Sequence, residues 1–142
     1  MTEHYHKLGR YLEALRQSSF LSVLKLEHDL SKRVVSPVFH RLFICFDGLK
    51  QGFLAACRRI ICVDGCFSGN IIGGMLLTAV GRDANDQMFP LAWAVVVGEN
   101  NESWEWVFKE LQKCIGERTR AGWTVVSDEH PVWFSFLIFF VG

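Results

Sequence analysis

Two short apolar runs, each rich in β-branched residues and each ending on an aspartate, constrain this sequence more than any other feature. The first run is IICVD, which ends at Asp64, and the second is WTVVSD, which ends at Asp128. Runs of this kind are typical of buried strands in a sheet that is covered on both faces. We therefore expect two central strands, each of which ends on a carboxylate.

The segments between the two runs predict how the strands pair. Apolar segments over residues 73–81 and 88–98 follow the first run after short turns, which favours an antiparallel meander of three strands. Apolar residues then recur at helical spacing from Trp104 to Ile115, with Asn101 as the expected cap. A helical crossover delivers the next strand parallel to an earlier one. The order β, β, β, α, β predicts an α/β fold in which the first and last strands are parallel neighbours.

Upstream of the first run, the sequence predicts a flanking region over residues 1–59. We expect an amphipathic helix, two extended segments and a short helix there, over residues 2–17, 20–26, 39–46 and 47–57. The core is expected over residues 60–128, and residues 129–142 form a divergent apolar tail. A chain of 142 residues has room for one hydrophobic core of ordinary size.

Composition excludes several classes of protein. Half of the residues are apolar and 21% are charged, which excludes intrinsic disorder and coiled coils. The 15 basic and 15 acidic residues cancel, although residues 1–59 carry ten basic and five acidic side chains and the rest of the chain the reverse. Five cysteines without a CxxC pair favour reduced thiols inside the cell. We expect no signal peptide, and no uncharged run reaches the roughly twenty residues that cross a membrane as a helix.

The two aspartates predict a metal site. Parallel neighbours end at the same edge of a sheet and lie about 4.8 Å apart, so Asp64 and Asp128 are expected to come close enough to share a divalent ion. Mg²⁺ prefers such oxygen ligands, and a pair of ions promotes in-line displacement at phosphorus. An aspartate that ends a strand is also commonly a turn or capping residue. The pattern alone leaves both interpretations open.

Three segments resemble a known family. They are CRRIICVDGCFSG, GGMLLTAVGRDANDQMFPLAWAVVVGENNESWEWVFKEL and GWTVVSD, and they resemble the transposase domain of Mutator-like elements (MULEs), with a likeness that covers roughly residues 3–128. The resemblance implies a partial RNase H-like fold and DNA strand transfer in the nucleus, dependent on Mg²⁺ or Mn²⁺ and on two aspartates and a glutamate. Asp64 and Asp128 match the two aspartates. Asp83 and Asp86 lie at or beside family positions, but in a polar turn.

The sequence also departs from this family. A Leu-Lys-Gly step usually follows the first aspartate, whereas here Phe67 is followed by Ser-Gly-Asn. Beyond Asp128 the only acidic residue is Glu129, which as an immediate neighbour would face the opposite side of a continuing strand. We therefore expect the third carboxylate to be absent and the chain to be a truncated, catalytically incompetent remnant. The apolar tail has three interpretations: a replacement strand that covers the sheet, translated intron or out-of-frame sequence, or a membrane-associating end.

Alternatives to a transposase remnant remain. One is a non-catalytic fragment that binds DNA or a full-length transposase through its basic first part, and another is a product with no selected function. Arg58 and Arg59 are candidates for phosphate contact, although a solvated loop is the more frequent explanation. Trp104 and Trp106 lie two apart on the expected helix, so only Trp104 is expected in the core, and Trp106 is a candidate for a base-stacking or partner surface.

Overall fold

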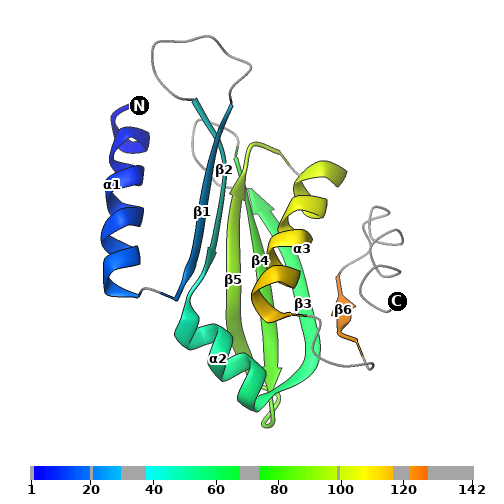
Figure 1. Ribbon diagram of the computed structural model, residues 1–142. Helices are drawn as coiled ribbons and strands as arrows, with labels where there is room; N and C mark the ends of the chain where they lie inside the picture. The colour runs from blue at the N-terminus through cyan, green and yellow to red at the C-terminus, as the bar shows by residue number, and fades with distance from the viewer. Residues whose placement is uncertain are drawn as a thin grey trace.

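A mixed six-stranded sheet lies at the centre of the described part of the chain, with helices on both faces (Figure 1). The computed structural model describes residues 2–19, 21–29, 38–67, 74–98, 100–116 and 122–127. Its elements are α1 (Thr2–Ser18), β1 (Val23–Asp29), β2 (Val38–Cys45), α2 (Asp47–Ala56), β3 (Cys57–Phe67), β4 (Met75–Asp83), β5 (Met88–Val96), α3 (Asn101–Ile115) and β6 (Thr124–Val126). The strand order across the sheet is β1-β2-β5-β4-β3-β6.

The elements from β3 to β6 follow the order that the sequence predicts. β3 pairs antiparallel with β4, and β4 pairs antiparallel with β5. After α3 the chain returns as β6, which pairs parallel with β3. The predicted fold class, α/β with an RNase H-like βββαβ core, is thereby confirmed.

The two extended segments expected upstream are strands of the same sheet. β1 and β2 form an antiparallel pair, and β2 pairs antiparallel with β5 from Arg41↔Val96 to Ile44↔Trp93. α2 then follows β2 directly, over nearly the residues that the sequence predicts for a short helix. The flanking residues therefore extend the sheet on the β5 side, whereas β6 lies at its other edge.

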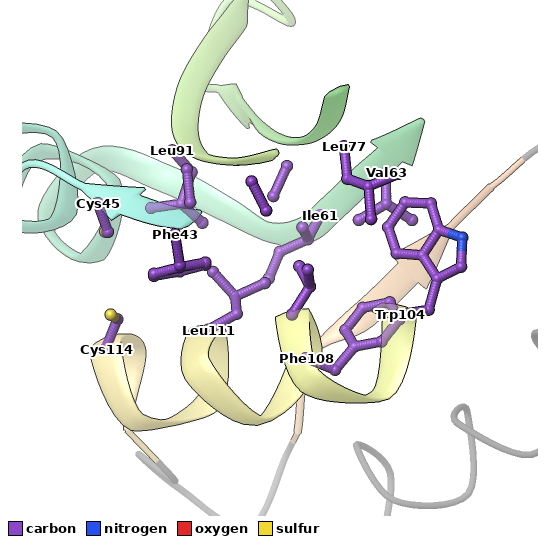
Figure 2. Close-up of a cluster of buried hydrophobic side chains, with 14 of the residues drawn as sticks. Phe43, Cys45, Ile61, Val63, Leu77, Leu91, Trp104, Phe108, Leu111 and Cys114 are labelled. Carbon is purple, nitrogen blue, oxygen red and sulfur yellow. The ribbon is translucent and has the colours of Figure 1, made fainter. Parts of the chain in front are cut away.

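Alternation along the strands separates two apolar clusters. On one face, α3 and α2 cover the main core, part of which is drawn in Figure 2. On the other face, Leu12 of α1 packs with Leu24 of β1 and Leu42 of β2 in a smaller cluster. Burial of these apolar side chains away from water is the main driving force that holds the helices to the sheet. The most enclosed large side chains of the main core are Phe43, Phe53, Ile61, Leu77, Leu91, Trp104 and Leu111.

Trp106 is buried, contrary to the prediction that only one of the two tryptophans faces the core. Its ring packs edge-on against Phe43, with 6.3 Å between ring centroids, and Arg41 lies over its face at 4.5 Å. Its indole N–H donates to Glu27 Oε1 at 3.3 Å. The prediction was wrong because it considered only the three strands of the meander. β1 and β2 widen the sheet, so the sheet buries more of the surface of α3, including Trp106.

α3 begins one residue earlier than its expected cap implies. The side chain of Asn100 accepts a hydrogen bond from the backbone N–H of Ser103 at 2.9 Å, and Asn101 is already helical. Asn100 is therefore the cap, because its extended backbone lets its side chain reach a free N–H of the first turn. The helix ends at Gly116, whose φ of 70° favours glycine.

A close approach between α2 and β4 fixes how the short helix sits on the sheet. Phe53 of α2 is fully buried, and a Cβ added at Gly81 of β4 would lie 2.6 Å from its ring carbons. The ring of Phe53 also stacks on Trp123, with 5.0 Å between centroids. Since Trp123 directly precedes β6, one aromatic side chain connects α2, β4 and the start of the parallel edge strand.

Candidate functional site

Asp64 lies on the sheet face that α3 does not cover. Its neighbours Ile61 and Val63 are buried in the main core, and alternation along β3 turns the Asp64 side chain to the opposite face, where it is exposed. Its Oδ1 accepts a hydrogen bond from the backbone N–H of Gly65 at 2.8 Å. Thr78 of β4 pairs with Asp64 and donates from Oγ1 to the Asp64 carbonyl oxygen at 3.4 Å.

Asp64 is not the last residue of its strand, contrary to the expectation that the first run ends there. β3 continues to Phe67, because Gly65, Cys66 and Phe67 pair with Leu77, Leu76 and Met75 of β4. The glycine after the aspartate indicates a turn from local sequence, but antiparallel pairing with β4 keeps the backbone extended. The carboxylate therefore projects from within the hairpin.

The parallel strand β6 lies directly beside the segment that leads to Asp64. Ile60, Ile61 and Cys62 pair with Thr124, Val125 and Val126, a constant offset of 64 residues. Val125 packs against the main core, whereas Thr124 and Val126 are exposed on the face that carries Asp64. Asp128, the second predicted site residue, and Glu129 lie outside the described residues.

Asp83 and Asp86, the other acidic residues at or beside family positions, belong to the turn that joins β4 to β5. Asp83 Oδ1 accepts hydrogen bonds from the backbone N–H groups of Asn85 and Gln87, both at 2.9 Å. Asp86 adopts a φ of 62° in the same turn. Asp83 lies five residues along β4 from Thr78, the partner of Asp64, so the structure does not bring it to that carboxylate.

Arg58 is engaged with this same turn. Its guanidinium donates to the carbonyl oxygen of Ala84 at 3.3 Å and lies 3.8 Å from Asp86 Oδ1. Arg59 is exposed on β3, next to Arg58. Both arginines, the candidates for phosphate contact, belong to the start of β3 and not to a loop.

Divalent-metal chemistry needs more than one carboxylate. Within the described residues there is no group of three or more His, Cys, Asp or Glu side chains that could hold a metal ion. Among the described residues of β3, Asp64 is the carboxylate on the sheet face that α3 does not cover. The half-buried Cys62 and the exposed Cys66 lie on the same side of the strand as Asp64.

Sequence patterns missed a polar network on the other side of the sheet. Glu110 of α3 is almost fully buried and lies 2.6 Å from Lys25 and 3.1 Å from Lys113. Glu27 lies between Lys25 and Arg41, at 3.3 Å and 2.6 Å. One feature of the sequence could have indicated this network: Glu110 is an acidic residue next to Leu111 on the apolar stripe of the helix, and a buried carboxylate needs a partner.

Comparisons with known proteins agree with the geometry of the core. A family model described as the MULE transposase domain matches residues 60–135, which begins in β3 and includes the meander, α3 and β6. No curated protein and no solved structure matched the chain. Among the described residues, none of the helices is both long and apolar enough to cross a membrane.

Proposed function

Because the chain belongs to the MULE transposase domain family, we propose that it derives from a DNA transposase and that Asp64 is the first carboxylate of its strand-transfer site. The observation that carries this proposal is the position of Asp64, an exposed carboxylate inside the matched region and on the second strand from the sheet edge. An exposed carboxylate on a strand with a parallel neighbour is open to an oxygen-seeking cation and to the DNA backbone.

We propose Asp128 as the second carboxylate. β3 and β6 pair at a constant offset of 64 residues as far as Cys62 and Val126, and Asp64 and Asp128 stand at this same offset in the sequence. Cys62 and Val126 share the sheet face on which Asp64 is exposed, which supports the choice of Asp128 as the partner of Asp64. Neighbouring strands are about 4.8 Å apart, a separation that lets two carboxylates share one ion.

The donor set fits Mg²⁺ or Mn²⁺ in part. The Asp64 carboxylate has two oxygen atoms. Oδ1 accepts the hydrogen bond from the Gly65 N–H, and Oδ2 has no partner among the described residues. Together with Asp128 it would supply two hard oxygen ligands, the kind that both ions prefer. A divalent ion held by Asp64 and Asp128 would supply charge stabilisation for the attacking and leaving oxygens of a phosphodiester.

Metal binding through Asp64 has a direct test. Titration of Mn²⁺ into the 142-residue protein, followed by the electron paramagnetic resonance signal of free Mn²⁺, is expected to show a weak site that Asp64→Asn abolishes. Asp86→Asn is the matched control, because asparagine also tolerates the positive φ of that exposed position. Equal Mn²⁺ binding by the protein and by Asp64→Asn would contradict the assignment.

We further propose that these 142 residues do not themselves cut or join DNA. Strand transfer in the family uses a third carboxylate, and Glu129 is poorly placed to supply it because it neighbours Asp128. Incubation with transposon-end duplexes and Mg²⁺ or Mn²⁺ is expected to give no metal-dependent product. Products that form with the unmodified protein and disappear in Asp64→Asn would overturn this proposal.

A second candidate function is DNA binding without catalysis. The uneven charge favours it, since residues 1–59 carry ten basic against five acidic side chains. Phosphate contacts of this kind weaken steeply as salt rises. A gel shift with duplex DNA that weakens as salt increases would support binding, and the absence of a shift at low salt would exclude it. DNA in the nucleus is the partner that both candidate functions imply.

A further inference from the structure

We propose, independently of the transposase ancestry, that residues 131–142 pack on an apolar part of the sheet that neither of the two apolar clusters includes. This surface lies on β4, β3 and β6, on the side of the sheet that carries Asp64. α2 and α3 cover the other side, and α1 packs with β1 and β2 at the far end of the sheet from β6 (Figure 1). We call this surface the open face, and its apolar members are Ile60, Cys62, Leu76, Val80 and Val126.

The open face is continuous across three strands. Val80 of β4 pairs with Cys62 of β3, and Cys62 pairs with Val126 of β6, so their side chains form one row. Alternation along the strands turns this row away from the main core, against which Ile61 and Val125 pack on the other side. Val126 is 47% exposed, and Cys62 and Val80 are half-buried. A continuous apolar surface of this kind indicates an interaction site.

The segment that follows β6 has a composition that suits this surface. Residues 131–142 carry no charge, and nine of the twelve are Val, Trp, Phe, Leu or Ile. They lie outside the described residues. Removal of apolar side chains from water is favourable for both partners of such a contact. Thr78 and Thr124, which flank the row on β4 and β6, are uncharged, so an uncharged segment also suits the surroundings of the row on these strands.

The covalent connection favours this segment over a separate partner. β6 lies at the sheet edge and ends at Val126, and four residues, 127–130, separate it from Pro131. Loops of that length commonly connect neighbouring elements. Twelve extended residues span at most about 40 Å, whereas β4 lies two strand spacings, about 10 Å, from β6. The tether gives the segment an effective concentration on the order of millimolar at the open face, which a second copy in dilute solution does not reach.

Asp64 limits the area that the segment covers. It is the next residue of β3 after Cys62 on the same side of the sheet, and its carboxylate is exposed. Enclosing an unpaired carboxylate under apolar side chains is costly. The segment is therefore expected over Ile60, Cys62 and Val80, with Asp64 outside the contact. The proposed metal binding at Asp64 does not depend on this contact.

Photo-crosslinking in the full chain tests the contact. The photoreactive residue p-benzoylphenylalanine replaces Phe136, in the middle of the segment, and the peptides linked after irradiation are identified by mass spectrometry. The expected links join residue 136 to peptides of β3 or β4. The same photoreactive residue in place of Tyr11, which is 61% exposed on α1, is the control and should give no such links. Absence of links from residue 136 to β3 and β4 would show that the proposal is wrong.

The same experiment separates the other occupants. In a mixture of isotopically heavy and light protein, links between a heavy and a light chain would identify a second copy as the occupant and overturn the proposal. Flotation of the protein with phosphatidylcholine vesicles, without links from residue 136 to β3 or β4 in their absence, would instead identify a lipid surface as the partner of the segment. Links within one chain, at any protein concentration, are the expected result.

A second measurement uses Cys62 as a reporter of the contact. In the double variant Phe134→Asp/Phe139→Asp, charges in the segment oppose its packing, and alkylation of Cys62 by iodoacetamide is expected to become about tenfold faster. Leu21→Asp, at a 62% exposed apolar position, is the matched control and should change this rate less than about twofold. Equal alkylation of Cys62 in the double variant and in the unmodified protein would contradict the proposal. Cys45 of the main core reports global unfolding; if it reacts, the variant has unfolded, and the crosslinks of the full chain decide.

Discussion

Lys25 of β1 and Glu110 of α3 are 85 residues apart in sequence, and their side chains form an ion pair of 2.6 Å at the inner surface of the sheet. The Glu110 side chain is 5% exposed, so its charge depends on Lys25 and Lys113 for compensation. The pair attaches the flanking hairpin to the helix that crosses the core. It therefore couples the stability of these two parts of the chain.

Replacement of Lys25 is expected to destabilise the protein. Lys25→Met leaves the buried Glu110 with Lys113 as its remaining partner, and we expect the free energy of unfolding to fall by about 1–2 kcal/mol. Lys109→Met is the matched control, because Lys109 pairs with Glu105 on the exposed side of the same helix and should change stability by less than about 0.5 kcal/mol. Urea unfolding measures both, and equal losses would contradict a special role for Lys25.

Acidification is expected to weaken the same network through Glu27. Burial opposes ionisation of this side chain, but the hydrogen bond and charge of Arg41, and then those of Lys25, hold its pKa below the usual 4.5. Since the folded pKa is the lower one, the stabilisation is complete well above pH 4.5 and is lost as the pH falls through the folded value. Stability measured by urea unfolding should therefore decline below about pH 4.5.

A variant isolates this contribution. Glu27→Gln cannot change charge, so its stability should depend less on pH between about pH 5 and pH 3 than that of the unmodified protein. Glu13→Gln, at an exposed position of α1, serves as the control and should keep the original dependence. If Glu27→Gln and Glu13→Gln show the same pH dependence, the ion pair with Arg41 does not contribute.

Local pattern was sufficient for the order of the core elements. The β-branched runs and the helical spacing from Trp104 to Ile115 are properties of short windows, and they predict β3 to β6 in the order that the structure shows. The extension of β3 past Asp64 was not predictable in this way, because it depends on pairing with β4.

Only those features of the candidate site that depend on β3 and its order in the chain were predictable from the sequence. The exposed position of Asp64 follows from alternation against Ile61 and Val63. The pairing partner of β3 follows from the crossover rule, and the structure confirms the parallel pair with β6. The burial of Trp106 was missed because it requires β1 and β2, whose place beside β5 no local pattern indicates.

Gly81 is expected to be intolerant of even one methyl group. A Cβ there would lie 2.6 Å from the ring of Phe53, which is fully enclosed and is stacked on Trp123. We expect Gly81→Ala to lower the free energy of unfolding by about 1–3 kcal/mol through overpacking. Gly48→Ala is the matched control, because that helical position has open space and alanine should stabilise it by about 0.5–1 kcal/mol. Thermal unfolding of both variants measures these changes in stability. A Gly81→Ala variant as stable as the unmodified protein would contradict the close approach between Gly81 and Phe53.

Removal of the flanking residues is expected to prevent the core from folding. A fragment over residues 60–142 starts where the family match starts, but it lacks Phe43, Cys45 and Phe53, which are fully buried in the main core. It also leaves β5 as an unpaired, apolar edge where Ile44 faces Trp93 in the intact sheet. We expect this fragment to show no cooperative thermal transition and to aggregate.

The control for this truncation removes α1 alone. Deletion of residues 1–19 removes Leu12 and exposes Leu24 and Leu42, the other buried members of the smaller cluster, but leaves the main core and all the described strands intact. This shorter deletion should therefore still unfold cooperatively, at a lower temperature than the full chain. Circular dichroism during heating distinguishes the two. A fragment 60–142 that melts cooperatively within a few degrees of the full chain would show that β1, β2 and α2 are not needed for the stability of the transposase core.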